Sequence, residues 1–128
     1  MLDPAAKILI VDDTLAMLVS LRRALWQLGY ANILEGENGE EGLYLMRANP
    51  DIALVISDWN MEPVDGLEFL RAMRADARFK DVPFILASAD AATVRKLAMV
   101  SGATVVLAKP FTTDILSGAL ASLGVGNA

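Results

Sequence analysis

The chain has 128 residues, of which 55% are hydrophobic and 21% are charged, and its mean hydropathy is +0.44. This length fits one domain with a proper core, and this composition excludes a disordered chain. The net charge of −5 argues against direct binding of DNA, because phosphate contacts need clustered Lys and Arg. The chain contains no Cys and no His, so disulfides, thiolate sites, His-based catalysis and a phosphohistidine of its own are excluded.

The ends and the apolar stretches carry no signal for a membrane or for export. The longest segment without charge, residues 97–108, is too short to span a bilayer and is interrupted by Ser101 and Gly102. Residues 1–4 lack the basic and apolar regions of a signal peptide. We therefore expect a cytoplasmic protein with one domain over residues 1–128, frayed at 1–5 and 124–128.

Short apolar runs alternate with amphipathic segments along the whole chain. We expect strands at residues 7–11, 31–35, 53–56, 83–87 and 104–108. We expect helices after Asp13 or Thr14 up to about residue 28, and over about 39–48, 66–75, 92–100 and 113–123. Asn38 and Asp65 are each followed by an acidic residue three positions later, which is typical of a helix N-cap. Five such units predict a mostly parallel sheet with helices on both faces and right-handed crossovers.

Charged and hydroxyl side chains follow four of the five expected strands. These residues are Asp12, Asp13, Asp58, Ser88 and Lys109. The carboxyl ends of parallel strands meet at one edge of a sheet, so we expect these side chains to converge. Any one of them alone is more often a turn, a cap or a strand exit, and only the set as a whole favours a functional site.

The convergent set favours phosphoryl transfer. Three close carboxylates repel one another unless a cation intervenes, and Mg²⁺ takes oxygen ligands of this kind. Lys109 provides a positive point charge suited to a phosphoryl oxygen. Asp58 is then the candidate nucleophile, because carboxylates form aspartyl phosphates, and Ser88 is a candidate hydrogen-bond donor to the new phosphoryl group.

Four motifs in this order and spacing closely resemble the response regulator receiver domain. They are V-D-D-T, S-D-W-N-M-E-P-V-D-G, A-S-A-D and K-P-F. The resemblance covers essentially the whole chain and is strongest to stand-alone receivers of the chemotaxis type. It implies an α/β fold, namely a single doubly wound (βα)5 flavodoxin-like domain with a five-stranded parallel sheet.

The resemblance also implies a function. Asp58 would accept a phosphoryl group from a histidine kinase or a phosphotransfer protein, and the chain would then switch its affinity for a partner protein. Mg²⁺ would bind Asp13, Asp58 and the backbone carbonyl of Asn60, with Asp12 acting mainly through water. The chain would catalyse only its own phosphorylation and dephosphorylation, and we therefore do not expect an enzyme with a separate substrate.

The resemblance has two further implications at the phosphorylation site. Ser88 and Lys109 would bind the phosphoryl oxygens, and the Lys109–Pro110 peptide bond would be cis.

Two positions depart from the family pattern. Glu62 stands where the family usually has Pro, so the loop after Asp58 is expected to differ in shape. Val106 stands where the family commonly has Tyr or Phe, so an aromatic rotamer switch cannot be carried over.

The first helix raises a separate question about docking. Its core face is expected to consist of the residues at helical spacing, namely Met17, Leu21, Ala24, Leu25 and Leu28. A second side carries residues that we expect to be partly exposed, namely Leu15, Leu18, Arg22 and Trp26. We slightly favour a wide packed face, and the alternative is a docking stripe for the helical bundle of a kinase.

Two other functions remain open at this stage. One is a pseudo-receiver that binds proteins without being phosphorylated. The other is an aspartate-nucleophile phosphatase, which usually needs an acidic residue two positions after the nucleophile, where Asn60 stands. A flavin or nucleotide binder is less favoured, because neither G-x-G-x-x-G nor a Walker A run is present.

Overall fold

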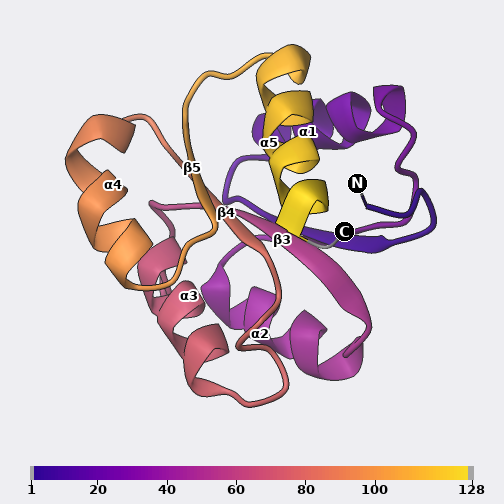
Figure 1. Ribbon diagram of the computed structural model, residues 1–128. Helices are drawn as coiled ribbons and strands as arrows, with labels where there is room; N and C mark the ends of the chain where they lie inside the picture. The colour runs from indigo at the N-terminus through magenta and orange to yellow at the C-terminus, as the bar shows by residue number, and fades with distance from the viewer. Residues whose placement is uncertain (1, 127–128) are drawn as a thin grey trace.

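The computed structural model describes residues 2–126, over which five strands alternate with five helices (Figure 1). The strands are β1 (Lys7–Val11), β2 (Ile33–Gly36), β3 (Ile52–Asp58), β4 (Phe84–Ser88) and β5 (Val105–Ala108). The helices are α1 (Leu15–Gln27), α2 (Gly39–Ala48), α3 (Gly66–Ala75), α4 (Ala91–Val100) and α5 (Thr113–Gly126). The predicted alternation is confirmed, and the strand bounds differ from the expected ones by two residues at most.

The five strands form one parallel sheet in the order β2-β1-β3-β4-β5. Helices α1 and α5 cover one face of this sheet, and α2, α3 and α4 cover the other (Figure 1). The predicted doubly wound (βα)5 fold of the flavodoxin-like type is therefore confirmed. The strand order reverses between β1 and β3, and the crevice at such a reversal is where open α/β sheets bind their ligands.

The core consists of two apolar layers, one on each face of the sheet. Ile10 packs in the layer that contains Leu25 of α1, whereas its neighbour Leu9 packs in the layer that contains Phe69 of α3. Phe69 also meets the ring of Phe84 edge to face, with ring centroids 5.2 Å apart. Because central strands are buried on both faces, nearly every residue in them is apolar, which explains the high hydropathy of a small domain.

Helix ends follow local capping chemistry. The Asn38 side chain accepts a hydrogen bond from the backbone N–H of Glu41. Asp65 and Glu68 form a full capping box, in which each side chain accepts from the other's backbone N–H. The caps at Asn38 and Asp65 were correctly predicted from their spacing to an acidic residue. After α1, Gly29 adopts φ of +97°, a conformation that favours glycine.

The expected frayed segments, 1–5 and 124–128, lie partly outside the described residues. Helix α5 continues to Gly126, three residues beyond the predicted end, and residues 1 and 127–128 lie outside the described part. At the other end, the backbone carbonyl of Leu2 accepts a hydrogen bond from the Tyr30 hydroxyl at 3.2 Å. Within residues 2–126, no helix is both long and apolar enough to cross a membrane.

The exposed and buried sides of α1 agree with the prediction except at one residue. Leu15 and Trp26 are 74% and 58% exposed, as expected for the second side. Leu18 is buried, so its predicted exposure is wrong. It packs in the apolar layer that also contains Ile10 of β1 and Leu25 of α1, so the buried sector of α1 is wider than the helical spacing alone suggested. Arg22 is half-buried and pairs with Glu35 of β2.

A pair of glycine substitutions tests how tightly α3 approaches β3. A Cβ on Gly66 would overlap the backbone carbonyl oxygen of Asp58 and lie 2.9 Å from Cδ1 of Leu86. We expect Gly66→Ala to lower the free energy of unfolding by about 1–3 kcal/mol in urea titrations. A Cβ on Gly118 in α5 would have no neighbouring atom within 4 Å, so Gly118→Ala should stabilise by about 0.5–1 kcal/mol. A Gly66→Ala variant as stable as the parent would contradict the close approach.

Candidate functional site

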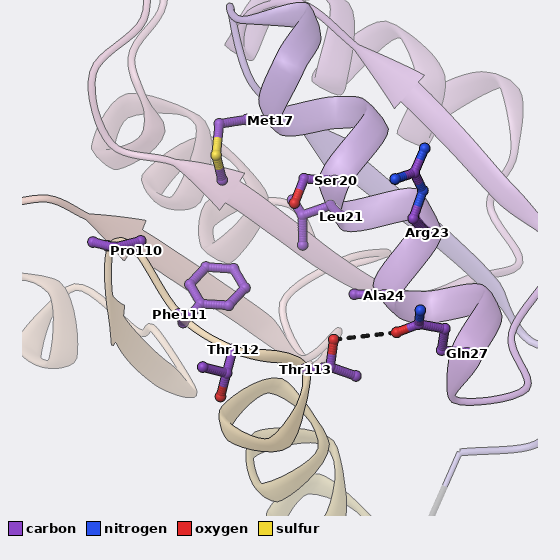
Figure 2. A pocket seen from close by; sticks show the side chains of 10 residues that line it. All are labelled: Met17, Ser20, Leu21, Arg23, Ala24, Gln27, Pro110, Phe111, Thr112 and Thr113. Atoms are coloured by element: carbon purple, nitrogen blue, oxygen red, sulfur yellow. Dashed lines mark hydrogen bonds between the residues drawn. The ribbon is translucent and has the colours of Figure 1, made fainter.

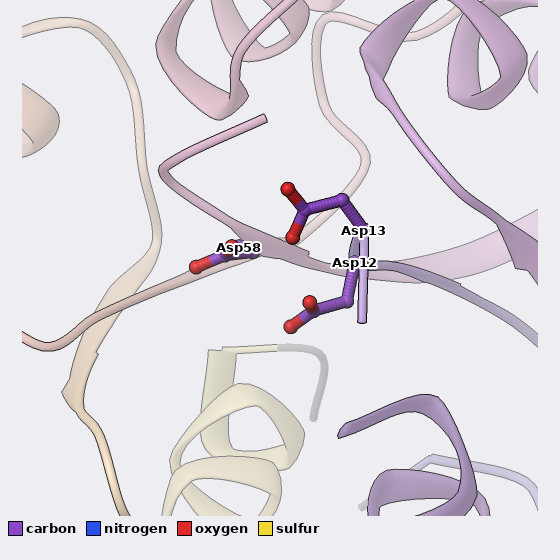
Figure 3. Close-up of side chains that lie close together, drawn as sticks. All are labelled: Asp12, Asp13 and Asp58. Carbon is purple, nitrogen blue, oxygen red and sulfur yellow. The ribbon is translucent and has the colours of Figure 1, made fainter. Parts of the chain in front are cut away.

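Three carboxylates meet at the carboxyl edge of the sheet, where the strand order reverses. Asp12 and Asp13 follow β1, and Asp58 is the last residue of β3. One carboxylate oxygen from each of the three lies within 4.8 Å of the other two (Figure 3). Asp12 and Asp58 are buried, whereas Asp13 is exposed. The fold therefore brings together three of the residues that the sequence singled out.

A lysine that follows the fifth strand joins two of these carboxylates. The Lys109 Nζ lies 2.9 Å from Asp12 Oδ2 and 2.9 Å from Asp58 Oδ1. Burial alone would lower the pKa of Lys109, but its hydrogen bonds to the two carboxylates raise that pKa above its ordinary value. Burial raises the pKa of Asp58, although the contact with Lys109 opposes this shift. The site is thus a charge network in which the partly buried Lys109 ammonium joins two buried carboxylates.

Both oxygens of Asp12 are already occupied by hydrogen-bond donors. Asp12 Oδ1 accepts from the backbone N–H of Thr14 at 3.0 Å and from its hydroxyl at 2.7 Å, and Lys109 occupies Oδ2. Thr14 stands at the N-cap of α1, but its side chain makes no capping bond because its hydroxyl donates to Asp12 instead. From the sequence, Thr14 was expected only as one of two alternative residues, with Asp13, that precede the first helix. The Asp-x-Thr spacing, which is typical of an Asx turn, could have revealed this second role.

Ser88 and Asn60 border the cluster from two further positions at this edge. Ser88 ends β4, is buried, and its Oγ accepts a hydrogen bond from the backbone N–H of Asp90 at 3.0 Å. The backbone N–H of Lys109 donates to the Ser88 carbonyl at 2.9 Å, which fixes the ends of β4 and β5 beside each other. Asn60 lines a hollow of about 600 Å³ whose wall includes Asp13. All the predicted site residues therefore lie at one edge.

The positions that depart from the family pattern are also placed. The Lys109–Pro110 peptide bond is cis, as the resemblance implied, and the Glu62–Pro63 bond is cis as well, which was not foreseen. Val106 is buried in the layer beneath α3 and α4, without an aromatic ring at that position. The guanidinium of Arg95 on α4 donates to the Val106 carbonyl at 3.4 Å.

The side chains of the cluster suit a hard divalent cation. They offer carboxylate oxygens and neither nitrogen nor sulfur, which is the donor set of Mg²⁺, Ca²⁺ or Mn²⁺ rather than of zinc or copper. Asp13 is the most accessible of the three, and Asp12 has both oxygens engaged. The residues present therefore fit the magnesium ion that the sequence predicted.

Comparison with known proteins agrees with this site. The family model of the response regulator receiver domain matches residues 8–121, and the chain belongs to this family. It is 35% identical over 111 residues to the chemotaxis protein CheY1 of Helicobacter pylori, covering 86% of this chain and 90% of that protein. It is 42% identical over 116 residues to a probable chemotaxis protein CheY of Rhizobium etli, covering 89% and 88%.

A solved structure supports the same assignment. The chemotaxis response regulator CheY4 of Vibrio cholerae superimposes with a TM-score of 0.84 at 28% identity, covering 92% of this chain and 98% of that one. The chain is thus a CheY-like response regulator of two-component, phosphorelay signalling.

The raised pKa of Asp58 makes a prediction about stability. The folded chain binds a proton at Asp58 more tightly than the unfolded chain does. The free energy of unfolding therefore falls as the pH rises through the pKa of Asp58 in the folded chain. This loss of stability persists at neutral pH. Asp58→Asn removes this cost, and Lys109 keeps its bond to Asp12. In EDTA at pH 7 we expect a gain of about 1 kcal/mol, seen as an increase of about 3–5 °C in Tm.

Circular dichroism melts at several pH values check this. The gain should shrink as the pH is lowered toward about 4, because Asp58 of the parent then becomes protonated in both states. Asp81→Asn is the matched control, since Asp81 is exposed and precedes β4, at the opposite edge of the sheet. A lower Tm for Asp58→Asn than for the parent at pH 7 would mean that the ion pair with Lys109 outweighs the burial cost.

Proposed function

We propose that this chain is a single-domain response regulator that accepts a phosphoryl group on Asp58 in a Mg²⁺-dependent reaction. The donor is the phosphohistidine of a histidine kinase or of a phosphotransfer protein, and phosphorylation changes the affinity for a partner protein. The observation that carries the proposal is the contact of the Lys109 ammonium with Asp58 beside Asp12 and Asp13. This arrangement joins a carboxylate nucleophile, a fixed cation and a metal-compatible oxygen set.

The chemistry assigned to these residues is an in-line phosphoryl transfer. A carboxylate oxygen of Asp58 forms the new O–P bond while the P–N bond of the donor breaks, and the imidazole leaves with the electron pair and takes up a proton. Lys109, whose raised pKa keeps it protonated, holds a phosphoryl oxygen by its charge. The Ser88 oxygen accepts from Asp90, so its hydroxyl hydrogen is free to reach another phosphoryl oxygen.

The proposed metal ligands are Asp13, Asp58 and the backbone carbonyl of Asn60. Asp12 is assigned an indirect role through water, because its two oxygens already bind Thr14 and Lys109. Mg²⁺, when bound, neutralises charge on the phosphoryl oxygens during transfer. The oxygen-only character of the cluster supports this assignment.

The same proposal covers location and activity. Transfer from a kinase places the protein in the cytoplasm, and the net charge of −5 supports protein partners rather than direct contact with DNA. We propose that the chain catalyses only its own phosphorylation and dephosphorylation. The aspartate-nucleophile phosphatase is less well supported because Asn60, two residues after Asp58, has no acid or base to offer. A pseudo-receiver is disfavoured by the complete cluster of carboxylates and Lys109.

Phosphorylation by a small donor tests the proposal directly. The purified chain is incubated with acetyl phosphate and Mg²⁺ and weighed by mass spectrometry over time. We expect one added phosphoryl group on the parent and on Asp81→Asn, and none on Asp58→Asn or on the parent in EDTA. Uptake by Asp58→Asn at the parental rate would refute the assignment of Asp58, and uptake in EDTA would refute the need for a metal.

Donor recognition is assigned to α1 and its neighbourhood. Leu15, Val19 and Trp26 are exposed large apolar side chains that recur along this helix. On another side of the helix, α1 and the segment after β5 enclose a hollow of about 270 Å³ that Met17 and Phe111 line (Figure 2). Exposed apolar groups of this kind are typical of interfaces, which supports the docking alternative for the helical bundle of the donor.

Alanine substitutions separate docking from chemistry. We expect Leu15→Ala with Trp26→Ala to slow transfer from the phosphorylated protein donor at least about tenfold, because large anchors dominate such interfaces. Phosphorylation by acetyl phosphate should stay at the parental rate. Tyr44→Ala is the matched control, since Tyr44 is 68% exposed but lies on α2. Unchanged transfer from the protein donor would contradict the docking role of α1.

A further inference from the structure

The hollow beside the carboxylate cluster is strongly acidic. Its volume is about 600 Å³, and four carboxylates line it, from Asp13, Glu62, Asp65 and Glu68, whereas no Lys or Arg among residues 2–126 lines it. Asp13 belongs both to this wall and to the cluster with Asp12 and Asp58. The hollow is therefore continuous with the proposed phosphorylation site, and its charge acts on whatever approaches Asp58 from this side.

The four carboxylates differ in how far their charge is compensated. Asp65 and Glu68 each accept a hydrogen bond from a backbone N–H at the start of α3, where the helix dipole also favours negative charge. Glu62 is exposed, and among residues 2–126 no hydrogen bond or salt bridge involves its side chain. Lys109 cannot offset the negative charge of Glu62, because the Lys109 ammonium already binds Asp12 and Asp58. Glu62 therefore contributes an uncompensated negative charge at the mouth of the site.

We propose that Glu62 is a specificity determinant that selects among phosphoryl donors by their charge. It disfavours small donors with two negative charges, such as acetyl phosphate, relative to donors with a smaller net charge, such as phosphoramidate. Proteins with cationic groups beside the phosphohistidine belong to the favoured class. The inference rests on the proposed function, because it concerns the donor from which Asp58 takes its phosphoryl group.

The two small donors deliver the same group and differ in charge and leaving group. With acetyl phosphate, the O–P bond to Asp58 forms as acetate leaves with the electron pair of the broken P–O bond. With phosphoramidate, the P–N bond breaks and ammonia leaves. Near neutral pH, acetyl phosphate is a dianion, whereas phosphoramidate carries a protonated nitrogen and a net charge of −1. A fixed charge near the site must therefore act more strongly on acetyl phosphate.

Neutralising and reversing the charge of Glu62 gives a graded test. Phosphorylation rates are measured by mass spectrometry for the parent, Glu62→Gln, Glu62→Lys and Asp81→Asn. For acetyl phosphate at low ionic strength, we expect Glu62→Gln to raise the rate about threefold to fivefold and Glu62→Lys about tenfold or more. For phosphoramidate, the increase with Glu62→Gln should be about twofold. These differences should shrink above about 0.2 M salt, where the Debye length falls to about 7 Å.

The control variant and the magnesium concentration isolate the effect of position. Asp81→Asn removes the same unit of charge from the far edge of the sheet and should leave both rates near the parental values. Because Glu62 also attracts cations, each variant is assayed at saturating Mg²⁺, established from the rise in Tm with added metal. An altered metal affinity then cannot be mistaken for donor selection.

The outcomes separate this inference from the function on which it rests. Suppose that the parent is phosphorylated but the phosphorylation rates of the Glu62 variants equal those of the parent or of Asp81→Asn. The inference is then overturned and the proposed function stands. The same holds if the Glu62 variants change the rates with both donors equally. The inference is also overturned if the effect of Glu62 does not depend on salt. The remaining outcome is that neither donor modifies the parent or any variant, although Mg²⁺ raises their Tm. The inference and the proposed function then both fail, because Glu62→Lys should have removed the charge barrier to acetyl phosphate.

Discussion

The salt bridges of Lys109 to Asp12 and Asp58 are the interaction on which the site depends. They include a contact between residues 97 positions apart in the sequence, and they lock the exit of β5 to those of β1 and β3. A partly buried ammonium between two buried carboxylates compensates part of the cost of burying them, which would otherwise favour protonation of Asp58. The network thus opposes the rise in the pKa of Asp58 that burial causes, which favours the charged carboxylate that the proposed nucleophile needs.

This network is possible only because the sheet is parallel and doubly wound. Each strand that supplies a charged residue is covered on both faces, so the strands themselves are apolar and polar residues appear only where the strands end. The reversal of strand order between β1 and β3 leaves the crevice between helices of opposite faces uncovered. Asp12, Asp13 and Asp58 lie there, so the fold supplies both the closeness of the charges and their access to solvent.

The sequence predicted the parts of this arrangement that depend on periodicity and strand ends. Alternating units indicated the sheet and its covering helices, and Asp12, Asp58 and Lys109 were correctly expected at one edge. What could not be predicted depends on how elements pack in three dimensions. Leu18 is buried because the apolar layer on this face of the sheet takes in a wider sector of α1 than the spacing indicated, and Glu62 lines the acidic hollow because of the path of the loop after β3. Neither follows from residue spacing.

Val106 constrains how the proposed phosphorylation of Asp58 would affect the rest of the molecule. The position is buried and aliphatic, so no ring at this position can move into space vacated by Ser88. The Ser88 hydroxyl oxygen instead binds the backbone N–H of Asp90, and Asp90 begins α4 without a capping bond from its own side chain. A change in the hydrogen bonding of Ser88 therefore acts first on the backbone at the start of α4. Under the proposed function, a change at Ser88 would therefore reach α4 through the loop between β4 and α4 and not through an aromatic rotamer at position 106.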